Sequence, residues 1–354
     1  MKINGVLFVE IYVGMAKMVA WWHQMALGFT LKGIRESKGK YGDEITYWLQ
    51  SGDANILITS ALDPAAHDVI SFVDRHGNSI KRFGIEVDSI NSTYDFLKKS
   101  SAILTSGIVE EEVGDEYSAR INIKLFDDNE ISFVERKNCV APFAGFNNIE
   151  HSFSQNFIKN IDHLASVVRI NEADFWNQYL SNILNLQLVQ TIGEEFFANL
   201  LSGMKMFVLN SSIGKFSKVI VEPLPEKEKK SQVDVFLNSH FGNGIQHLAF
   251  EVDDLIQTVE LLKSKGVIFT KVPEKYYIDL EKEAPELPIE MLRKANILCE
   301  KDEDKILLQV FTEPIGDRPT LFYEFIQRVN SYKGFGATNV KQLFKALENH
   351  LNND

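Results

Sequence analysis

The sequence predicts an α+β protein made of two similar domains. Its 354 residues exceed the ~100–200 residues of a typical single domain. Several segments of the first half recur in the second half, and the recurring segments alternate between strand-like and helix-like patterns of apolar residues. A duplicated unit of strands and helices is therefore the starting interpretation.

Each half opens with a strand followed by a helix. Residues 6–13 form an apolar strand-like segment, and the helical stretch after it contains Met18, Trp21, Trp22 and Met25. Residues 161–168 repeat this strand, and the next helical stretch contains Phe175, Trp176, Tyr179 and Leu180. The two stretches have their apolar residues in similar places, which indicates a repeat.

A longer parallel joins residues 83–100 to residues 248–265. Both segments predict a strand, then a turn containing aspartate that caps an amphipathic helix. A third parallel joins residues 133–136 to residues 325–328, and each of these closes a strand. Each half is therefore predicted to contain two βαβ-like modules with strand hairpins.

A polar, loop-like stretch over residues 138–156 separates the repeats. We therefore predict one domain over residues 1–150 and a second over residues 151–354. The second carries an insertion at residues 276–304, predicted to be a surface excursion with a short helix at residues 289–294. Residues 339–351 have helical apolar spacing and predict a C-terminal helix.

Composition excludes several classes of function. The net charge of −12 argues against a nucleic-acid partner, since phosphate binding requires clustered Lys and Arg. No uncharged apolar run approaches the ~18 residues of a membrane helix, and no signal peptide is evident. The chain has two cysteines, Cys139 and Cys299, which gives no disulfide framework and favours a cytoplasmic location.

A candidate metal site emerges in the second half. Overlaying the repeats gives three equivalent strand positions, which hold His163, His247 and Glu324. Two histidines and one carboxylate form the ligand set of non-haem Fe(II) oxygenases, which keeps positions open for substrate and O₂. A single histidine in an apolar strand is more often a core residue. A carboxylate among aromatic residues, however, is costly unless it is paired or bound to metal.

The first half lacks this ligand set. The corresponding positions are approximately Glu10, Arg82 and Ser132. An arginine in place of His247 cannot bind a metal cation. The first domain is therefore predicted to be a copy of the scaffold without a metal site.

The same segments resemble the 4-hydroxyphenylpyruvate dioxygenase and 4-hydroxymandelate synthase family. The resemblance rests on residues 161–163, 242–247, 316–328 and 334–340, and it is weaker before residue 161. It implies the vicinal-oxygen-chelate fold, also called glyoxalase/dihydroxybiphenyl-dioxygenase-like. In that fold, paired βαβββ modules form open barrels in two similar domains, here followed by a C-terminal helix. The first domain would be structural or serve oligomerisation.

The resemblance also implies roles for individual residues. His163, His247 and Glu324 would bind Fe(2+), and Phe335 and Asn339 would belong to a C-terminal helix that gates the cavity. Phe311 and Phe322 would enclose an aromatic ring. The substrate-binding positions would be Gln232, Gln246, Gln309, Phe311, Phe322, Phe335, Asn339, Met206, Val221 and Val340.

The implied reaction is centred on iron, without a separate protein acid or base. An aryl 2-oxo acid, 4-hydroxyphenylpyruvate or a phenylpyruvate-like compound, would react with O₂, lose CO₂ and be hydroxylated. A dioxygenase of this family oxidises the ring and forms homogentisate, as in tyrosine catabolism. A mandelate synthase hydroxylates the benzylic carbon. The resemblance further suggests a homodimer or homotetramer.

The expected product depends on positions where the chain departs from the dioxygenase pattern. Val221 and Val340 are branched aliphatic residues, as in mandelate synthases, and they favour benzylic hydroxylation. Met206 fits neither group and leaves few partners for a phenolic hydroxyl, which favours phenylpyruvate as an alternative substrate. Residues 316–320 and 334–336 resemble dioxygenases instead, so homogentisate formation stays an alternative.

Two readings outside this reaction remain open. A non-catalytic binding protein of the same fold is one, although such proteins generally lack a complete ligand set. Extradiol ring cleavage also uses two histidines and one glutamate. Residues 316–320 and 334–336 favour the branch that acts on 2-oxo acids.

Overall fold

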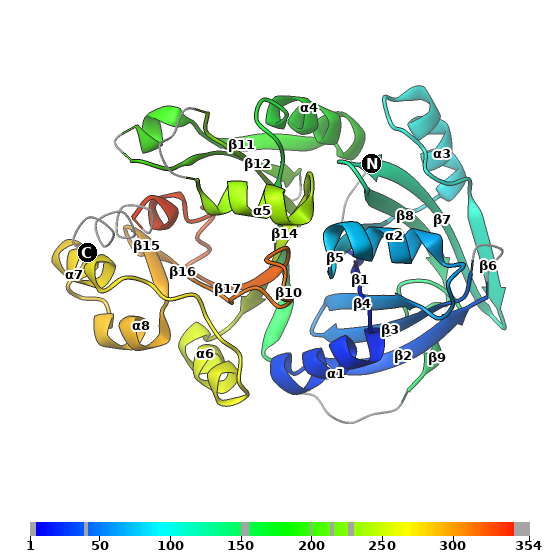
Figure 1. The fold of residues 1–354 in the computed structure, drawn as a ribbon, viewed down its shortest axis with the longest axis horizontal. Coiled ribbons are helices and arrows are strands. Elements are labelled where there is room, and N and C mark those ends of the chain that lie inside the picture. Colours follow the sequence, from blue (N-terminus) through cyan, green and yellow to red (C-terminus); the bar gives the residue numbers. More distant parts are fainter. Residues whose placement is uncertain are drawn as a thin grey trace.

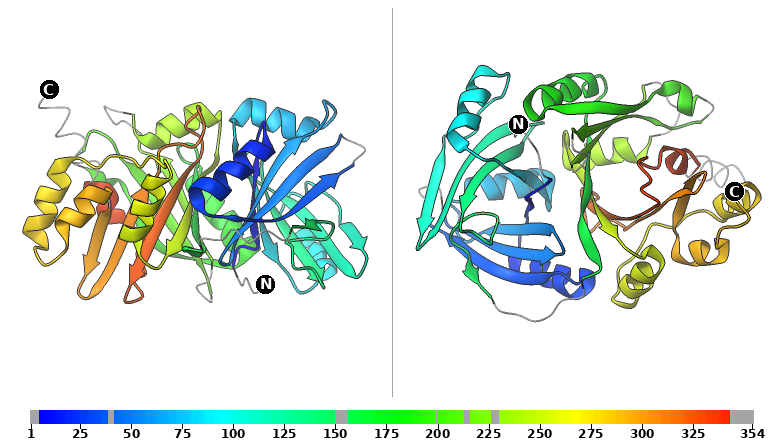
Figure 2. Two further views of the ribbon diagram at one scale, coloured as in Figure 1. Left: turned by 90° about the horizontal axis from the view of Figure 1, so that it is seen from below. Right: turned by 180° about the vertical axis from the view of Figure 1, so that it is seen from behind.

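The computed structural model describes residues 5–38, 42–149, 156–198, 200–212, 216–225 and 230–342. Two strongly curled sheets lie side by side, one in each half of the chain (Figure 1). The same arrangement is seen from below and from behind in Figure 2. Within the described ranges, no helix is long and apolar enough to cross a membrane.

The first sheet has the strand order β6-β7-β8-β5-β1-β4-β3-β2-β9. Its strands are β1 (Phe8–Tyr12), β2 (Thr30–Ser37), β3 (Glu44–Ser51), β4 (Ala54–Ala61), β5 (Ser79–Glu86), β6 (Val109–Val113), β7 (Glu116–Leu125), β8 (Asn129–Lys137) and β9 (Asn147–Asn148). Three helices accompany it: α1 (Ala16–Leu27), α2 (His67–His76) and α3 (Ile90–Lys99).

The second sheet has the order β11-β12-β13-β10-β14-β17-β16-β15. Its strands are β10 (Ile158–Val167), β11 (Leu186–Ile192), β12 (Met204–Ser211), β13 (Ser217–Pro223), β14 (Gly244–Val252), β15 (Leu298–Asp302), β16 (Lys305–Phe311) and β17 (Phe322–Val329). Its helices are α4 (Ala173–Leu184), the 3-10 turn η1 (Glu194–Phe197), α5 (Gln232–His240), α6 (Leu255–Ser264), α7 (Glu274–Glu283) and α8 (Ile289–Ala295).

The two sheets have the same topology. Apart from β9, replacing β1 to β8 by β10 to β17 turns the order of the first sheet into that of the second sheet, read from its opposite edge. In both, the first strand of the repeat pairs in parallel with its fourth strand and antiparallel with its fifth. The duplication predicted from the sequence is therefore present throughout the fold.

The helix that follows the repeated turn begins slightly earlier than the sequence pattern indicates. In the first half the cap is Ser89, whose side chain accepts from the Ser92 N–H, rather than the preceding aspartate. In the second half Asp254 caps α6 and accepts from the Gln257 N–H. A side-chain oxygen at this position satisfies an amide that has no partner inside the helix, which fixes where the helix starts.

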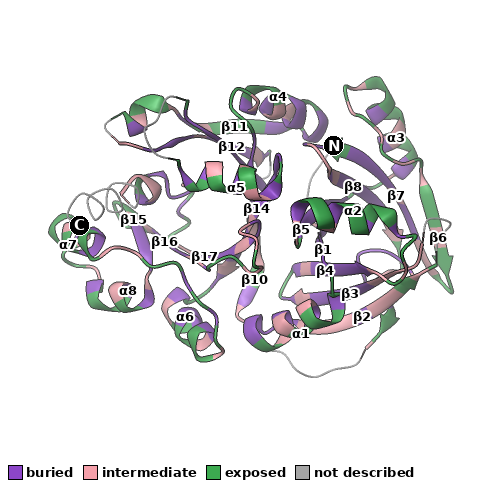
Figure 3. Cartoon of the chain, viewed as in Figure 1, coloured by how far each residue is buried: buried purple, intermediate pink, exposed green. Residues whose placement is uncertain are grey.

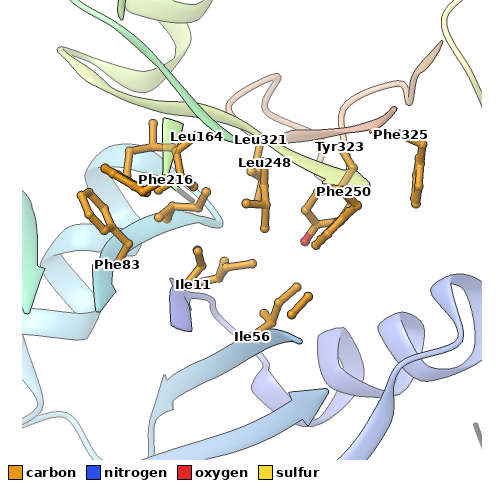
Figure 4. Close-up of a cluster of buried hydrophobic side chains, with 14 of the residues drawn as sticks. Ile11, Ile56, Phe83, Leu164, Phe216, Leu248, Phe250, Leu321, Tyr323 and Phe325 are labelled. Carbon is orange, nitrogen blue, oxygen red and sulfur yellow. The ribbon is translucent and has the colours of Figure 1, made fainter. Parts of the chain in front are cut away.

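The main hydrophobic core joins the two halves. Figure 4 shows Ile11 and Ile56 of the first half facing Leu248, Phe250 and Tyr323 of the second. These side chains are almost completely buried. Figure 3 shows the complementary pattern on the helices, which bury one side and expose the other. Because burial of apolar surface is the main favourable term in folding, this shared core is expected to hold the halves together.

The insertion at residues 276–304 is more than a surface excursion. It forms α7, α8 and β15, and the predicted short helix corresponds to α8. Tyr276 and Tyr277 on α7 are buried, so this helix packs into the second half. The predicted C-terminal helix is present at residues 337–342, so Asn339 lies on it, whereas Phe335 lies before its start. The rest of the predicted helix, residues 343–351, lies outside the described residues.

Candidate metal centre and cavity

Three neighbouring strands place the predicted ligands together. His163 on β10 is opposite Ala249 on β14, and Ala249 is in turn opposite Glu324 on β17. His247 lies two residues before Ala249 on the same strand, so its side chain leaves the same face of the sheet. These strands lie at the centre of the second sheet in Figure 1.

The ligand atoms converge on one point. Glu324 Oε2 lies 3.2 Å from His163 Nε2 and 3.3 Å from His247 Nε2. One candidate ligand atom from each residue lies within 4.8 Å of the others. The glutamate is 1% exposed, so its carboxylate has left bulk water. Such a buried carboxylate needs a compensating cation, and the nitrogen–nitrogen–oxygen donor set fits a divalent transition metal such as Fe(2+).

The electrostatics of the three residues fit the same interpretation. Burial raises the pKa of Glu324, but the two histidines outweigh that effect and hold the pKa at about 2. Burial lowers the pKa of His163, but the Glu324 and Asp162 carboxylates outweigh it and raise the pKa to about 9. Burial keeps the pKa of His247 below its usual value. The carboxylate is therefore ionised, and a positive charge is favoured beside it.

His163 is oriented by a carboxylate behind it. Its Nδ1 donates to Asp162 Oδ2 at 2.7 Å, and Arg328 donates to both oxygens of Asp162 at 2.7 and 2.8 Å. A carboxylate in this position fixes the tautomer that exposes Nε2 to a metal. Neither Asp162 nor Arg328 was predicted as a site residue, although both lie within segments that carry the family resemblance.

His247 is positioned by packing instead. Among the described residues, none is within hydrogen-bonding distance of its buried Nδ1. Its ring stacks on Phe322 with the centroids 4.8 Å apart. Phe311 and Phe322 are 6.1 Å apart at an interplanar angle of 79°, so they form an edge-to-face pair rather than two parallel plates around a ring.

A cavity of about 290 Å³ adjoins the three ligands. All the predicted substrate-binding residues line it except Asn339, which is buried behind Gln309 and donates to its side-chain oxygen at 2.8 Å. The other residues that line it are Met204, Val219, Val233, Val235, Thr270, Thr312, Pro314 and Pro319.

Strand alternation could have identified some of the missed residues. Met206 is paired with Val221 across β12 and β13, and both line the cavity. Met204 and Val219 lie two residues away on the same strands and therefore share that face. The contributions of Thr270, Thr312, Pro314 and Pro319 come from irregular segments or strand ends, where sequence spacing gives no direction.

The first sheet carries different residues at the positions of the three candidate ligands. Its register places Phe8 opposite Gly84 and Gly84 opposite Ser132, as His163, Ala249 and Glu324 are arranged in the second sheet. The counterpart of His163 is therefore Phe8, and the expected counterpart Glu10 is wrong by two residues. Arg82 does occupy the place of His247.

Glu10 has a different role. Its carboxylate lies 3.0 Å from Arg82 Nε, and Glu130 lies 3.1 Å from another nitrogen of the same guanidinium. Arg82 thus supplies the positive charge that the second sheet is expected to obtain from a metal. Arginine stays charged at any physiological pH, so this guanidinium is a permanent partner for the two carboxylates.

Comparison with known proteins gives the same assignment. The family model of the Glyoxalase/Bleomycin resistance protein/Dioxygenase superfamily matches residues 160–309. The 4-hydroxyphenylpyruvate dioxygenase of Yarrowia lipolytica is 29% identical over 96% of this chain and 90% of its own length. The enzyme of the same name from Aspergillus fumigatus is 29% identical over 96% and 91%. A triple mutant of 4-hydroxymandelate synthase from Streptomyces coelicolor superimposes with a TM-score of 0.86, at 27% identity, over 99% of this chain and all of that chain.

Fold, site and relatives together define the chain as an enzyme, a dioxygenase of the vicinal-oxygen-chelate fold. Within that class, it is similar to 4-hydroxyphenylpyruvate dioxygenase and to 4-hydroxymandelate synthase, so the resemblance seen in its sequence is confirmed. The named relatives are enzymes, which argues against the non-catalytic alternative.

Proposed function

We propose that this chain is a cytoplasmic, Fe(2+)-dependent enzyme that uses O₂ to decarboxylate and hydroxylate an aryl 2-oxo acid. The observation that carries the proposal is the convergence of His163, His247 and Glu324 beside a largely apolar cavity. In this proposal residues 151–354 form the catalytic domain, and residues 1–150 form a structural domain that takes part in assembly as a homodimer or homotetramer.

The three residues would hold the iron, which when bound supplies the activation of O₂ that no side chain can provide. The protein's own part is to bind and orient the substrate. Gln246 and Gln309 are buried beside the ligands and can donate hydrogen bonds to the polar 2-oxo acid end. The aryl ring would then extend toward the apolar side of the cavity, where water is excluded.

Val221 and Val340, which are branched aliphatic residues as in mandelate synthases, line the apolar side of the cavity and favour benzylic hydroxylation. Met206 and Val221 lie opposite each other on adjacent strands, are 4% and 7% exposed, and face the cavity together with Val340. The valines offer no hydrogen-bond partner to a phenolic hydroxyl and the Met206 sulfur is only a weak acceptor, whereas an unpaired buried hydroxyl costs ~1–3 kcal/mol. Such a wall would hold the ring by packing alone and would accept phenylpyruvate as well as 4-hydroxyphenylpyruvate.

Formation of homogentisate is the competing reaction, and one observation favours it. The relatives from Yarrowia lipolytica and Aspergillus fumigatus, which cover nearly the whole chain, are both named 4-hydroxyphenylpyruvate dioxygenase. The two products are isomers that differ in which carbon is oxidised. Orientation of the ring decides between them, because the oxidised carbon is the one held closest to the iron.

The decisive experiment loads the purified chain with Fe(2+) without oxygen, then adds O₂ with 4-hydroxyphenylpyruvate or with phenylpyruvate. We expect CO₂ release from both and a mandelate-type product, identified by NMR because mass cannot separate the isomers. Homogentisate as the sole product from 4-hydroxyphenylpyruvate would refute benzylic hydroxylation but not the iron-dependent dioxygenase.

A ligand variant tests the metal site itself. His247→Ala should bind no stoichiometric Fe(2+) and release no CO₂, because the two remaining ligands, Glu324 and His163, are too few to hold the metal. His67→Ala, at an exposed histidine in the first half, should load iron and turn over as the wild type does. Stoichiometric iron in His247→Ala would contradict the ligand assignment.

A further inference from the structure

A chain of buried hydrogen bonds runs from the ligand Glu324 to helix α7. Gln309 Nε2 donates to Glu324 Oε1 at 2.7 Å, and Asn339 Nδ2 donates to Gln309 Oε1 at 2.8 Å. The Tyr276 hydroxyl lies 3.1 Å from Asn339 Oδ1. All four side chains are buried, and Glu324 is the most completely so.

The chemistry of the groups fixes the direction of this chain. A carboxylate can accept but not donate, so Gln309 must turn its NH₂ group to Glu324 and its oxygen to Asn339. The NH₂ of Asn339 then faces Gln309, and its oxygen faces Tyr276. The Tyr276 hydroxyl accepts from the Cys299 N–H at 2.8 Å and has one proton to share between Asn339 and the Cys299 carbonyl.

The backbone is shaped to admit this arrangement. Gly336 has a φ of +72°, and a Cβ at that position would lie 1.9 Å from Gln309 Oε1. Glycine therefore serves two purposes here, since it adopts the left-handed conformation and lets the backbone approach the amide of Gln309. The turn that precedes the C-terminal helix is thereby held against the carboxylate's hydrogen-bond partner.

The two oxygens of Glu324 have different partners. Oε2 is the atom that faces both histidines, whereas Oε1 is occupied by Gln309. An octahedral ion held by two imidazoles and one carboxylate oxygen has three positions left; binding by both oxygens would leave two. A 2-oxo acid that chelates takes two positions, so O₂ binding requires the third.

We infer that Tyr276 is a positioning residue: through Asn339 and Gln309 it keeps Glu324 a ligand through Oε2 alone and so preserves the position for O₂. This inference rests on the proposed function. It also gives the insertion at residues 276–304 a role in the site, because α7 brings Tyr276 to the end of the chain of hydrogen bonds.

Tyr276→Phe tests the inference, with nitric oxide as a probe for the O₂ position. Protein loaded with Fe(2+) and saturated with phenylpyruvate under anaerobic conditions is titrated with nitric oxide, and the iron–nitrosyl EPR signal is measured. We expect Tyr276→Phe to load iron but to bind nitric oxide roughly tenfold more weakly, the worth of one or two buried hydrogen bonds. Asn339→Asp, which removes the NH₂ that faces Gln309, should show the same loss.

Tyr277→Phe is the matched control. Tyr277 is the next residue of α7 and is also buried. Its hydroxyl donates to the Ile297 carbonyl oxygen at 3.2 Å and takes no part in the hydrogen bonds that link Tyr276 to Glu324. Its variant should bind nitric oxide as the wild type does. Unchanged binding by Tyr276→Phe, or an equal loss in Tyr277→Phe, would overturn the inference. Loss of iron from both Tyr276→Phe and Asn339→Asp would also overturn the inference. The hydrogen bonds would then be needed to bind the metal, and not to keep a coordination position free for O₂.

Failure of the proposed function would look different. In that case the wild-type chain would bind no Fe(2+), or phenylpyruvate would not affect its nitrosyl signal. The two failures are therefore separable by the wild-type measurement alone.

Discussion

At the scale of single residues, Met206 is the side chain most able to decide the substrate. It lies on β12 opposite Val221, is 4% exposed and faces the cavity. The side chain is flexible and apolar, so it packs well against an unsubstituted ring, and its thioether sulfur is only a weak acceptor for a phenol. Its position was singled out from the sequence, and the structure places it in the cavity wall. Its effect on substrate choice remains a prediction.

We predict that Met206→Ser shifts preference toward 4-hydroxyphenylpyruvate. The new hydroxyl can bond the phenol, and one neutral hydrogen bond is worth about 1 kcal/mol, or roughly fivefold in the ratio of kcat/KM for 4-hydroxyphenylpyruvate over phenylpyruvate. Met206→Ala is the control, because it makes nearly the same cavity without the hydroxyl. Equal ratios in the two variants would show that the position does not contact the phenolic end.

At the scale of elements, the paired strands β1 and β5 show how the first copy of the site is closed. Gly84 lies opposite Phe8, just as Ala249 lies opposite His163. The aromatic ring is larger than the imidazole it replaces, and a Cβ on Gly84 would lie 2.1 Å from it. Glycine is thus required at position 84, because the Phe8 ring occupies the place that His163 has in the second sheet.

Gly84→Ala should therefore destabilise the protein without affecting iron. Overpacking in a closed core typically costs ~1–3 kcal/mol, since Phe8 is 1% exposed and has little room to move. Urea unfolding measures the loss, and iron per folded chain should equal that of the wild type. Gly107→Ala, where nothing lies within 4 Å of an added Cβ, should leave both quantities unchanged. A Gly84→Ala variant that lost iron but kept its unfolding free energy would contradict the view that packing at Phe8 and iron binding in the second sheet are independent.

Sequence patterns predicted the elements better than their exact pairing. The repeated strands and helices were identified because apolar residues recur at matching places in both halves. The sequence aligns Glu10 with His163 because register cannot be read from one strand, and a two-residue slip leaves the same face buried. Tyr276 was missed because its partners, Asn339 and Gln309, are distant in sequence and meet it only after folding.

At the scale of the whole molecule, the two halves share polar contacts as well as the core. His23 on α1 lies 2.6 Å from the Tyr323 hydroxyl on β17, and its Nδ1 lies 2.7 Å from the Val19 carbonyl. The carbonyl can only accept, so Nδ1 carries the proton and Nε2 accepts from the tyrosine. The neutral imidazole is therefore the form that fits between the halves, directly behind the strand that carries Glu324.

This contact predicts that acid weakens the joined structure. Burial lowers the pKa of His23 to about 4, despite the opposing bond to Val19, whereas an unfolded histidine titrates near 6.5. Because the unfolded chain takes up this proton first, the contribution is complete above about pH 6.5 and is lost as the pH falls toward 4. The full loss is about 3 kcal/mol. Between pH 7 and 4.5, the unfolding free energy of the wild type should therefore fall by about 2–3 kcal/mol more than that of His23→Gln, which has no proton to gain. Parallel curves in urea unfolding would show that His23 is not the group through which acid acts.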